Sequence, residues 1–234
     1  YNPLGFQQCR EGELATPGVI ALDGPVAAGK TAVGKLVAQR LKYRFVDTGS
    51  MYRAVTWLAL EEGVPLEEPA LAALAQRVRI RVVESPGGAR ILVGERDVTD
   101  LLRSPRVEGA VSIVSQVLEV RQAMVCQQQE IAREGRIVMA GRDIGTVVLP
   151  DAKLKLFLTA SVQERARRRY DELCALGQQV SYEEVLAGLR ERDRLDSQRA
   201  HSPLRPAGDA RIVDTDGKGL EQVVAEILAL AERG

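Results

Sequence analysis

The segment GPVAAGKT, residues 24–31, constrains the fold of this chain more than any other feature of the sequence. Its spacing is that of the P-loop, G-x-x-x-x-G-K-[ST], in which small residues let backbone N–H groups converge on phosphate oxygens. Lys30 can then reach the β- and γ-phosphates, and the hydroxyl of Thr31 can ligate Mg²⁺. An apolar run at 19–22 precedes the loop, and apolar residues follow it at helical spacing: Val33, Leu36, Val37 and Leu41. The segment therefore predicts a strand, a phosphate-binding loop and a helix whose dipole favours bound phosphate.

Short apolar runs alternate with helical patterns along the rest of the chain. The runs that we expect to form strands are 19–22, 43–47, 136–140, 153–158 and 211–214. This alternation predicts an α/β fold, the three-layer fold of P-loop NTPases, with a parallel sheet of about five strands flanked by helices. Two more β-like runs, 79–83 and 90–93, are joined by the turn-rich ESPGGA and predict an inserted hairpin, followed by a helical stretch over 105–134.

The composition argues against several classes of protein. The 32 basic and 32 acidic side chains balance, so no basic excess points to a nucleic-acid partner. The only histidine, His201, argues against Ser-His-Asp catalysis, and three widely spaced cysteines give no zinc-ligand pattern and fit a reducing compartment. No apolar stretch approaches the ~20 residues of a membrane span, and no secretory signal is visible. We therefore expect a cytoplasmic protein without membrane partners.

The P-loop by itself does not choose among the proteins that bind nucleoside triphosphates. A GTPase would need Asn-Lys-x-Asp, but the only asparagine is Asn2, and the Leu-Ser-Gly-Gly-Gln-like signature of transport ATPases is absent from the sequence. A small kinase with a phosphorylated or acidic acceptor remains. Arginine, whose planar fork suits phosphate, recurs in DTGSMYR, GRD and RERDRLDSQR, although each could be a solvated side chain. The run RARRR at 165–169 could be an exposed helix face or an RNA contact.

Five stretches, in this order, make the chain resemble bacterial cytidylate kinases: IALDGPVAAGKT, FVDTGSMYRA, ILVGERDVTDLLRSPRVEGAVSIVS, GRDIGTVVLPDAKLKLFLTAS and RERDRLDSQR. The resemblance implies one kinase domain over 18–234, with 1–17 as a tail or linker. Within that domain it implies an insert over about 62–112 that binds the nucleoside monophosphate, and a lid over about 160–190. It also implies transfer of the γ-phosphate of ATP to CMP or dCMP, with Mg²⁺ as cofactor, by a protein that we expect to be a monomer.

The same resemblance implies roles for individual residues. Those implied to be catalytic are Lys30, Arg142, Arg192 and Arg199. Those implied to bind ATP are Gly24, Pro25, Val26, Ala27, Ala28, Gly29, Lys30 and Thr31 in the loop, with Thr31 on Mg²⁺, and Arg165, Arg168 and Arg169 in the lid. Those implied to bind CMP are Thr48, Tyr52, Arg53, Ser112, Arg121, Arg142, Asp143, Asp196 and Arg199. Of these, Ser112, Arg121 and Asp143 would face the cytosine and Asp196 the sugar hydroxyls.

Several alternatives stay open at this point. Ser115 lies close to Ser112 and could replace it at the base, although the spacing to Arg121 favours Ser112. Asp23 could orient waters around Mg²⁺ or could cap a strand end. The acceptor could be UMP or another small acidic metabolite instead of CMP. A nucleotide- or RNA-binding protein without turnover is the alternative from another class, and the presence of every expected phosphate-binding residue argues against it.

Overall fold

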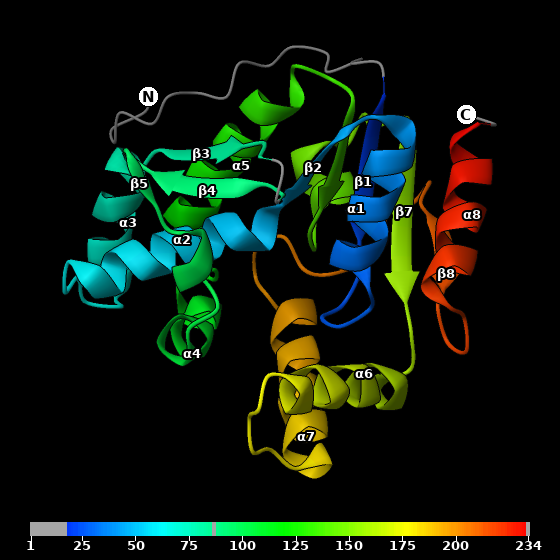
Figure 1. Ribbon diagram of the computed structural model, residues 1–234. Helices are drawn as coiled ribbons and strands as arrows, with labels where there is room; N and C mark the ends of the chain where they lie inside the picture. The colour runs from blue at the N-terminus through cyan, green and yellow to red at the C-terminus, as the bar shows by residue number, and fades with distance from the viewer. Residues whose placement is uncertain (1–17, 86–87, 233–234) are drawn as a thin grey trace. The chain divides into compact units, whose positions relative to one another are not determined.

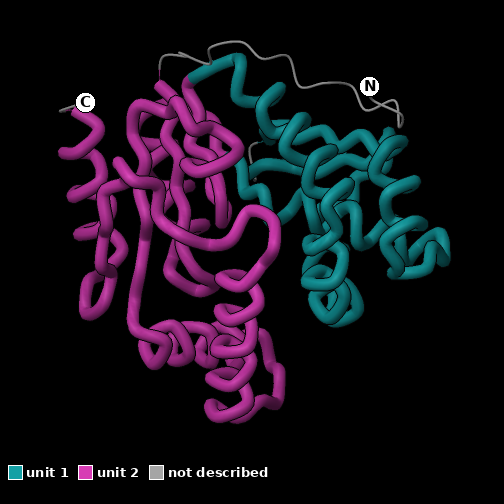
Figure 2. Tube along the Cα trace, turned by 180° about the vertical axis from the view of Figure 1, so that it is seen from behind, with its two compact units in different colours: residues 1–16, 46–135 teal, residues 17–45, 136–234 magenta. Residues whose placement is uncertain are grey.

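The computed structural model describes residues 18–85 and 88–232. The expected tail at 1–17 and two residues of the ESPGGA turn lie outside the described residues. The described chain divides into two compact units, shown in two colours in Figure 2. We call residues 18–45 and 136–232 the sheet unit and residues 46–135 the helical unit, and each is described by itself.

The sheet unit is built on the predicted parallel sheet (Figure 1). The strands of this sheet are β1 (Val19–Asp23), β2 (Arg44–Asp47), β6 (Ile137–Ala140), β7 (Leu154–Thr159) and β8 (Arg211–Asp214), in the order β2-β6-β1-β7-β8. The boundary between the two units falls within β2, after Phe45. Each strand lies within one residue of its predicted range at either end. Central β1 is buried along its whole length and pairs in parallel with β6 and β7, so that Leu22 lies opposite Ala140 and Leu156. The predicted fold class is confirmed.

Helices pack on this sheet and extend from it. The elements are α1 (Lys30–Leu41), the π-helical turn η2 (Ile144–Val148), α6 (Val162–Ala175), α7 (Tyr182–Ser197) and α8 (Leu220–Ala231). Helices α1 and α8 contact each other and share a core with the strands, in which Val37 and Ile227 are almost fully buried beside Leu156. Helices α6 and α7 pack on each other around a smaller core. Because β1 is central, the loop that follows it leaves the middle of the sheet's carboxyl edge, where ligands bind in such folds.

The helical unit contains the predicted hairpin. Its elements are α2 (Thr48–Glu61), α3 (Glu68–Arg77), β3 (Ile80–Val83), β4 (Arg90–Val93), β5 (Arg96–Asp97), the 3₁₀ turn η1 (Thr99–Leu101), α4 (Pro105–Val114) and α5 (Leu118–Ala132). Strands β3 and β4 pair antiparallel, and the short β5, which the sequence analysis did not predict, extends them to three strands. Helix α4 packs on α2, and α5 packs on α3.

The helical stretch expected at about 105–134 consists of two helices, because the chain breaks between α4 and α5. Val117 has extended backbone angles, with φ −66° and ψ 125°, and the Arg121 guanidinium donates from Nη1 to the Ser115 carbonyl at 3.1 Å. Each of the two helices buries apolar residues, such as Val111 in α4 and Met124 in α5, so apolar character alone does not mark the break. Among the described helices, none combines the length and hydropathy that a membrane span requires.

Candidate active site

The backbone of the loop at 24–31 takes conformations that favour small residues. Gly24 has φ +146° and Gly29 has φ +91°, and Ala27 lies in the left-handed region at φ +59°. A Cβ on Gly24 would overlap the carbonyl oxygen of Leu158 on β7, so the strand presses directly on the start of the loop. The glycine at this position is therefore required by packing as well as by backbone angle.

Lys30 and Thr31 begin α1 at the end of this loop. The Lys30 side chain is buried, and its Nζ donates to the Pro25 carbonyl at 2.6 Å, which turns the ammonium back over the loop. Gly29, the residue before the helix, gives no side-chain cap, as expected of a helix N-terminus that receives phosphate. Thr31 is half-buried, and its hydroxyl oxygen is a ligand of the kind that Mg²⁺ takes in proteins.

Asp23 ends β1 immediately before the loop, and its carboxylate is 3% exposed. Its Oδ1 accepts from the Ile144 N–H and its Oδ2 from the Gly145 N–H, both at 2.7 Å. Burial, with a smaller contribution from the charge of Asp143, raises the pKa of Asp23 to about 6, although both hydrogen bonds and Lys30 oppose this rise. Of the two roles considered for Asp23, capping is the one that its contacts support.

Three residues predicted to bind the acceptor lie together in the sheet unit. Arg142 follows β6, and its Nε donates to Asp196 Oδ2 at 2.8 Å. Arg199 forms a second ion pair with the other oxygen of Asp196. Burial opposes the ionisation of Asp196, but the charges of Arg142 and Arg199 outweigh it, with Arg192 adding, and hold its pKa below the usual value. The result is an ionised carboxylate enclosed by three of the four residues expected to be catalytic.

The arginines of α6 are paired with neighbouring groups. Arg165 is buried and binds both oxygens of Asp193, at 3.1 and 2.6 Å, as well as the carbonyl of Val26 in the loop. Arg168 donates to Thr215 Oγ1 at 2.9 Å and to its carbonyl at 2.6 Å. The other arginines of the RARRR run form ion pairs with acids of α6: Arg167 with Glu164 and Asp171, and Arg169 with Glu172. This face is therefore balanced in charge, which does not favour the RNA contact considered above.

The helical unit carries the remaining predicted acceptor residues. Asp47 caps α2 by accepting from the Gly49 N–H at 3.0 Å, and Thr48 and Tyr52 are buried on the first turns of that helix. The Arg121 guanidinium lies 5.3 Å from the Tyr52 ring centroid, within the range of a cation–π contact. The two residues lie on α2 and α5, far apart in sequence, so this pairing depends on tertiary packing.

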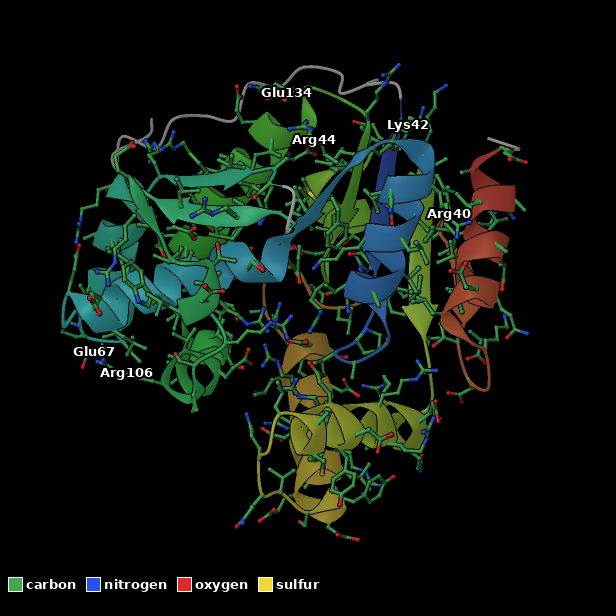
Figure 3. All side chains as sticks on the ribbon, viewed as in Figure 1. Arg40, Lys42, Arg44, Glu67, Arg106 and Glu134 are labelled. Carbon is green, nitrogen blue, oxygen red and sulfur yellow. The ribbon has the colours of Figure 1, made fainter. Side chains whose placement is uncertain are left out.

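Arg53 and the two candidate serines lie nearby in the same unit. Arg53 Nε donates to Glu108 Oε1 at 2.7 Å, which attaches α2 to α4. Arg106, labelled in Figure 3, adds a bond from α4 to the Leu60 carbonyl at 2.9 Å. Ser115 is buried and donates to the Ser112 carbonyl at 3.3 Å, whereas Ser112 is half-buried. These contacts leave the choice between Ser112 and Ser115 open.

Sequence reasoning missed the groups that pair with the predicted arginines, which are two acids and one residue that accepts through its hydroxyl and its carbonyl. Asp193, Glu108 and the Thr215 carbonyl are partners of predicted site residues, yet none was singled out. Asp193 could have been found, because it directly follows Arg192 in the RERD stretch. Glu108 and Thr215 lie 55 and 47 residues from their partners, so only the fold reveals them.

Comparison with known proteins decides between the kinase classes that this geometry allows. A sequence model of the family described as cytidylate kinase matches residues 20–233. The chain belongs to the cytidylate kinase family. Among its relatives, the cytidylate kinase of Carboxydothermus hydrogenoformans is 48% identical over 215 residues, which cover 92% of this chain and 97% of the relative. The cytidylate kinase of Bacillus subtilis is 45% identical, with 92% of this chain and 96% of the relative covered.

Solved structures agree with the fold of this family member. A shikimate kinase from Bacteroides thetaiotaomicron aligns with a TM-score of 0.50 at 15% identity, covering 92% of this chain and 98% of that chain. At this identity the likeness concerns the fold alone, a parallel sheet flanked by helices around a phosphate-binding loop. The cytidylate kinase assignment therefore comes from the sequence relatives.

Proposed function

We propose that this protein transfers the γ-phosphate of ATP to CMP or dCMP and releases ADP with CDP or dCDP. The observation that carries the proposal is that one unit contains both a phosphate-binding loop and the Arg142–Asp196–Arg199 cluster. The loop suits a triphosphate donor, and the cluster suits an acceptor with a sugar and a phosphate. The family of the chain supports the choice of cytidine nucleotides.

The donor binds at residues 24–31 in this proposal. Lys30, which already lies over the loop, exchanges the Pro25 carbonyl for the transferring phosphate, and Thr31 holds Mg²⁺ together with phosphates and water. The metal supplies positive charge that neutralises the phosphates during transfer. Arg168 and Arg169 contribute to ATP binding from α6, and Arg165 acts there through its contact with the Val26 carbonyl.

The resemblance to cytidylate kinases assigns the acceptor contacts to individual residues. Arg53, Arg142 and Arg199 bind its phosphate, Asp196 its sugar hydroxyls, and Thr48 and Tyr52 line the site. Ser112, Arg121 and Asp143 read the cytosine, whose N4 amine donates to a carboxylate where the uracil O4 would be repelled.

The transfer itself needs charge neutralisation and positioning more than acid–base chemistry. The attacking oxygen belongs to an acceptor phosphate that is already ionised, so the chain needs no strong general base. Lys30, Arg142, Arg192 and Arg199 stabilise negative charge on the moving phosphoryl group in an enclosed site, where such charges act strongly. The proposal is completed by an acceptor insert over about 62–112, a lid over about 160–190, and a cytoplasmic monomer that acts on free nucleotides.

A panel of acceptors tests the proposed substrate. ADP release is measured with CMP, dCMP, UMP and shikimate, and the proposal expects kcat/KM to be highest for the cytidine nucleotides. UMP as the better acceptor would contradict the base assignment. ATP binding without any acceptor-dependent ADP would favour the nucleotide-binding protein without turnover.

A substitution at Asp143 tests the proposed base recognition. Asp143→Asn is expected to lower the preference for CMP over UMP by roughly ten- to a hundredfold, because an amide can turn either a donor or an acceptor toward the base. The matched control is Asp151→Asn, at an exposed position after the same loop. If kcat/KM falls equally for both acceptors, Asp143 has a structural role instead.

A further inference from the structure

The loop that follows β6 begins with two amides that no residue of its own turn satisfies. In the π-helical turn η2 the first N–H groups have no partner earlier in the helix, as at any helix N-terminus. The backbone bonds within the turn run from Val148 to Asp143 and from Leu149 to Ile144. The Ile144 and Gly145 N–H groups instead donate to Asp23, which precedes them by 121 and 122 residues. Asp23 is therefore a cap supplied by another strand.

The position of the Asp23 carboxylate is fixed from both sides. On one side, Gly24 follows it directly and is pressed by the Leu158 carbonyl. On the other side, a Cβ on Gly145 would lie 3.3 Å from side-chain carbons of Lys155 and 3.4 Å from Asp23 Oδ2. Neither position has room for a side chain, so the segments that meet here pack closely. The carboxylate thus joins the start of the phosphate-binding loop to the segment that carries Arg142 and Asp143.

The charged groups around Asp23 make this cap sensitive to protonation. Asp143 repels its ionised form and Lys30 stabilises it, while the Lys155 ammonium is paired with Asp209 at 2.8 Å. Burial is the largest influence and raises the pKa of Asp23 to about 6. When one oxygen is protonated, the carboxyl carries a donor, and one of the two N–H groups then faces another donor.

We propose that Asp23 is a positioning residue whose ionised carboxylate holds residues 142–148 in the form that presents Arg142 and Asp143 to the acceptor. The proposal rests on the acceptor role given to these two residues above. Protonation of Asp23, or its replacement by asparagine, removes one of the two capping bonds, so residues 142–148 become less well ordered. The affinity for the acceptor then falls, while the donor site, which has its own contacts, is retained.

Steady-state kinetics of Asp23→Asn tests the proposal, because the amide copies the protonated carboxyl in size and hydrogen bonding. Above pH 7 we expect KM for CMP to rise about tenfold, the size of one lost hydrogen bond to a charged group, and KM for ATP to stay within about twofold. The matched control is Asp171→Asn on the exposed face of α6, which should change neither constant. An equal rise in both KM values, or no rise for CMP, overturns the proposal.

The pH dependence separates positioning from a general structural effect. The ratio of wild-type to variant kcat/KM for CMP, in which ionisation of the substrate cancels, should fall from about ten above pH 7 to less than about two below pH 5. A ratio that does not change with pH overturns the proposal. If the wild-type protein phosphorylates no nucleoside monophosphate, the proposed function fails. If the wild type turns over normally and Asp23→Asn has the same kinetic constants, only the positioning role of Asp23 fails.

Amide hydrogen exchange supplies a readout that needs neither turnover nor the variant. In the wild-type protein, protection of the Ile144 and Gly145 amides should drop at least fivefold between pH 7 and pH 5.5, relative to amides within α1. In Asp23→Asn, the protection of these two amides should be low at both pH 7 and pH 5.5. Constant protection in the wild-type protein overturns the proposal even if the variant fails to fold.

Discussion

At the scale of the residue, Lys30 combines an observed structural contact with the catalytic role proposed for it. Its ammonium is buried and bonded to the Pro25 carbonyl, so Lys30→Ala removes one hydrogen bond and leaves the apolar core in place. We expect turnover to fall by ~10²–10³, because a charge aimed at the transferring phosphate is lost. The measurement is kcat with saturating ATP and CMP, with circular dichroism to confirm the fold. Lys35→Ala, on the exposed face of the same helix, is the control. Near-normal turnover of Lys30→Ala would contradict the P-loop mechanism.

At the scale of the element, α1 packs closely on the strands because a glycine lies on its buried face. Gly34 lies on the buried face of α1, where a Cβ would overlap the Phe45 ring and lie 3.2 Å from Leu22. Gly34→Ala should therefore lower the free energy of unfolding by about 1–3 kcal/mol despite the better helix propensity of alanine. Urea unfolding measures this change. Ala32→Gly, at an exposed position of the same helix, should cost only the propensity difference of about 1 kcal/mol. A more stable Gly34→Ala protein would show that α1 can move away from the sheet.

At the scale of the whole molecule, two aspartates give opposite contributions to stability as a function of pH. Because the pKa of Asp196 is lower in the folded protein than in the unfolded chain, its ionised carboxylate stabilises the fold at pH values above the unfolded pKa. This stabilisation is lost as pH falls below about 4. The pKa of Asp23 is raised from 3.8 to about 6, so its ionisation is disfavoured in the fold, and the free energy of unfolding decreases as pH rises through that interval. The rise corresponds to about 3 kcal/mol.

Asp23→Asn should therefore unfold at a higher temperature than the wild type at pH 7, and the difference should vanish near pH 4. Calorimetry at both pH values measures this. A variant that is less stable at neutral pH would show that the two capping bonds outweigh the burial of the charge. A variant that is more stable than the wild type but has a higher KM for CMP is typical of substitutions at functional residues, where stability and activity are in conflict.

Ligand binding should order two segments of the molecule. Addition of CMP with a non-hydrolysable ATP analogue is expected to slow amide exchange in residues 79–112 and 160–200, because an open site would expose ATP to water. Each nucleotide alone serves as the control and should slow exchange less. Unchanged exchange in both segments would argue against closure on binding.

Local patterns in the sequence predicted most of the fold, and they singled out the loop that is proposed to bind the donor. Strands β1, β2, β6, β7 and β8 and the hairpin of β3 and β4 were found because each is a short apolar run bounded by turns. The loop at 24–31 was found because its chemistry depends on backbone spacing over eight adjacent residues. The resemblance to cytidylate kinases named Arg142, Asp196 and Arg199, and the structure places these three together.

Only the tertiary structure decided which groups hold these residues. Arg121 bonds to the Ser115 carbonyl at the break between α4 and α5, and the pairing of Arg53 with Glu108 joins two helices. The bonds from Asp23 to Ile144 and Gly145 join segments more than a hundred residues apart, and burial then changes the pKa of that carboxyl. A sequence records side-chain chemistry and local periodicity, whereas desolvation and long-range pairing exist only once strands and helices have packed.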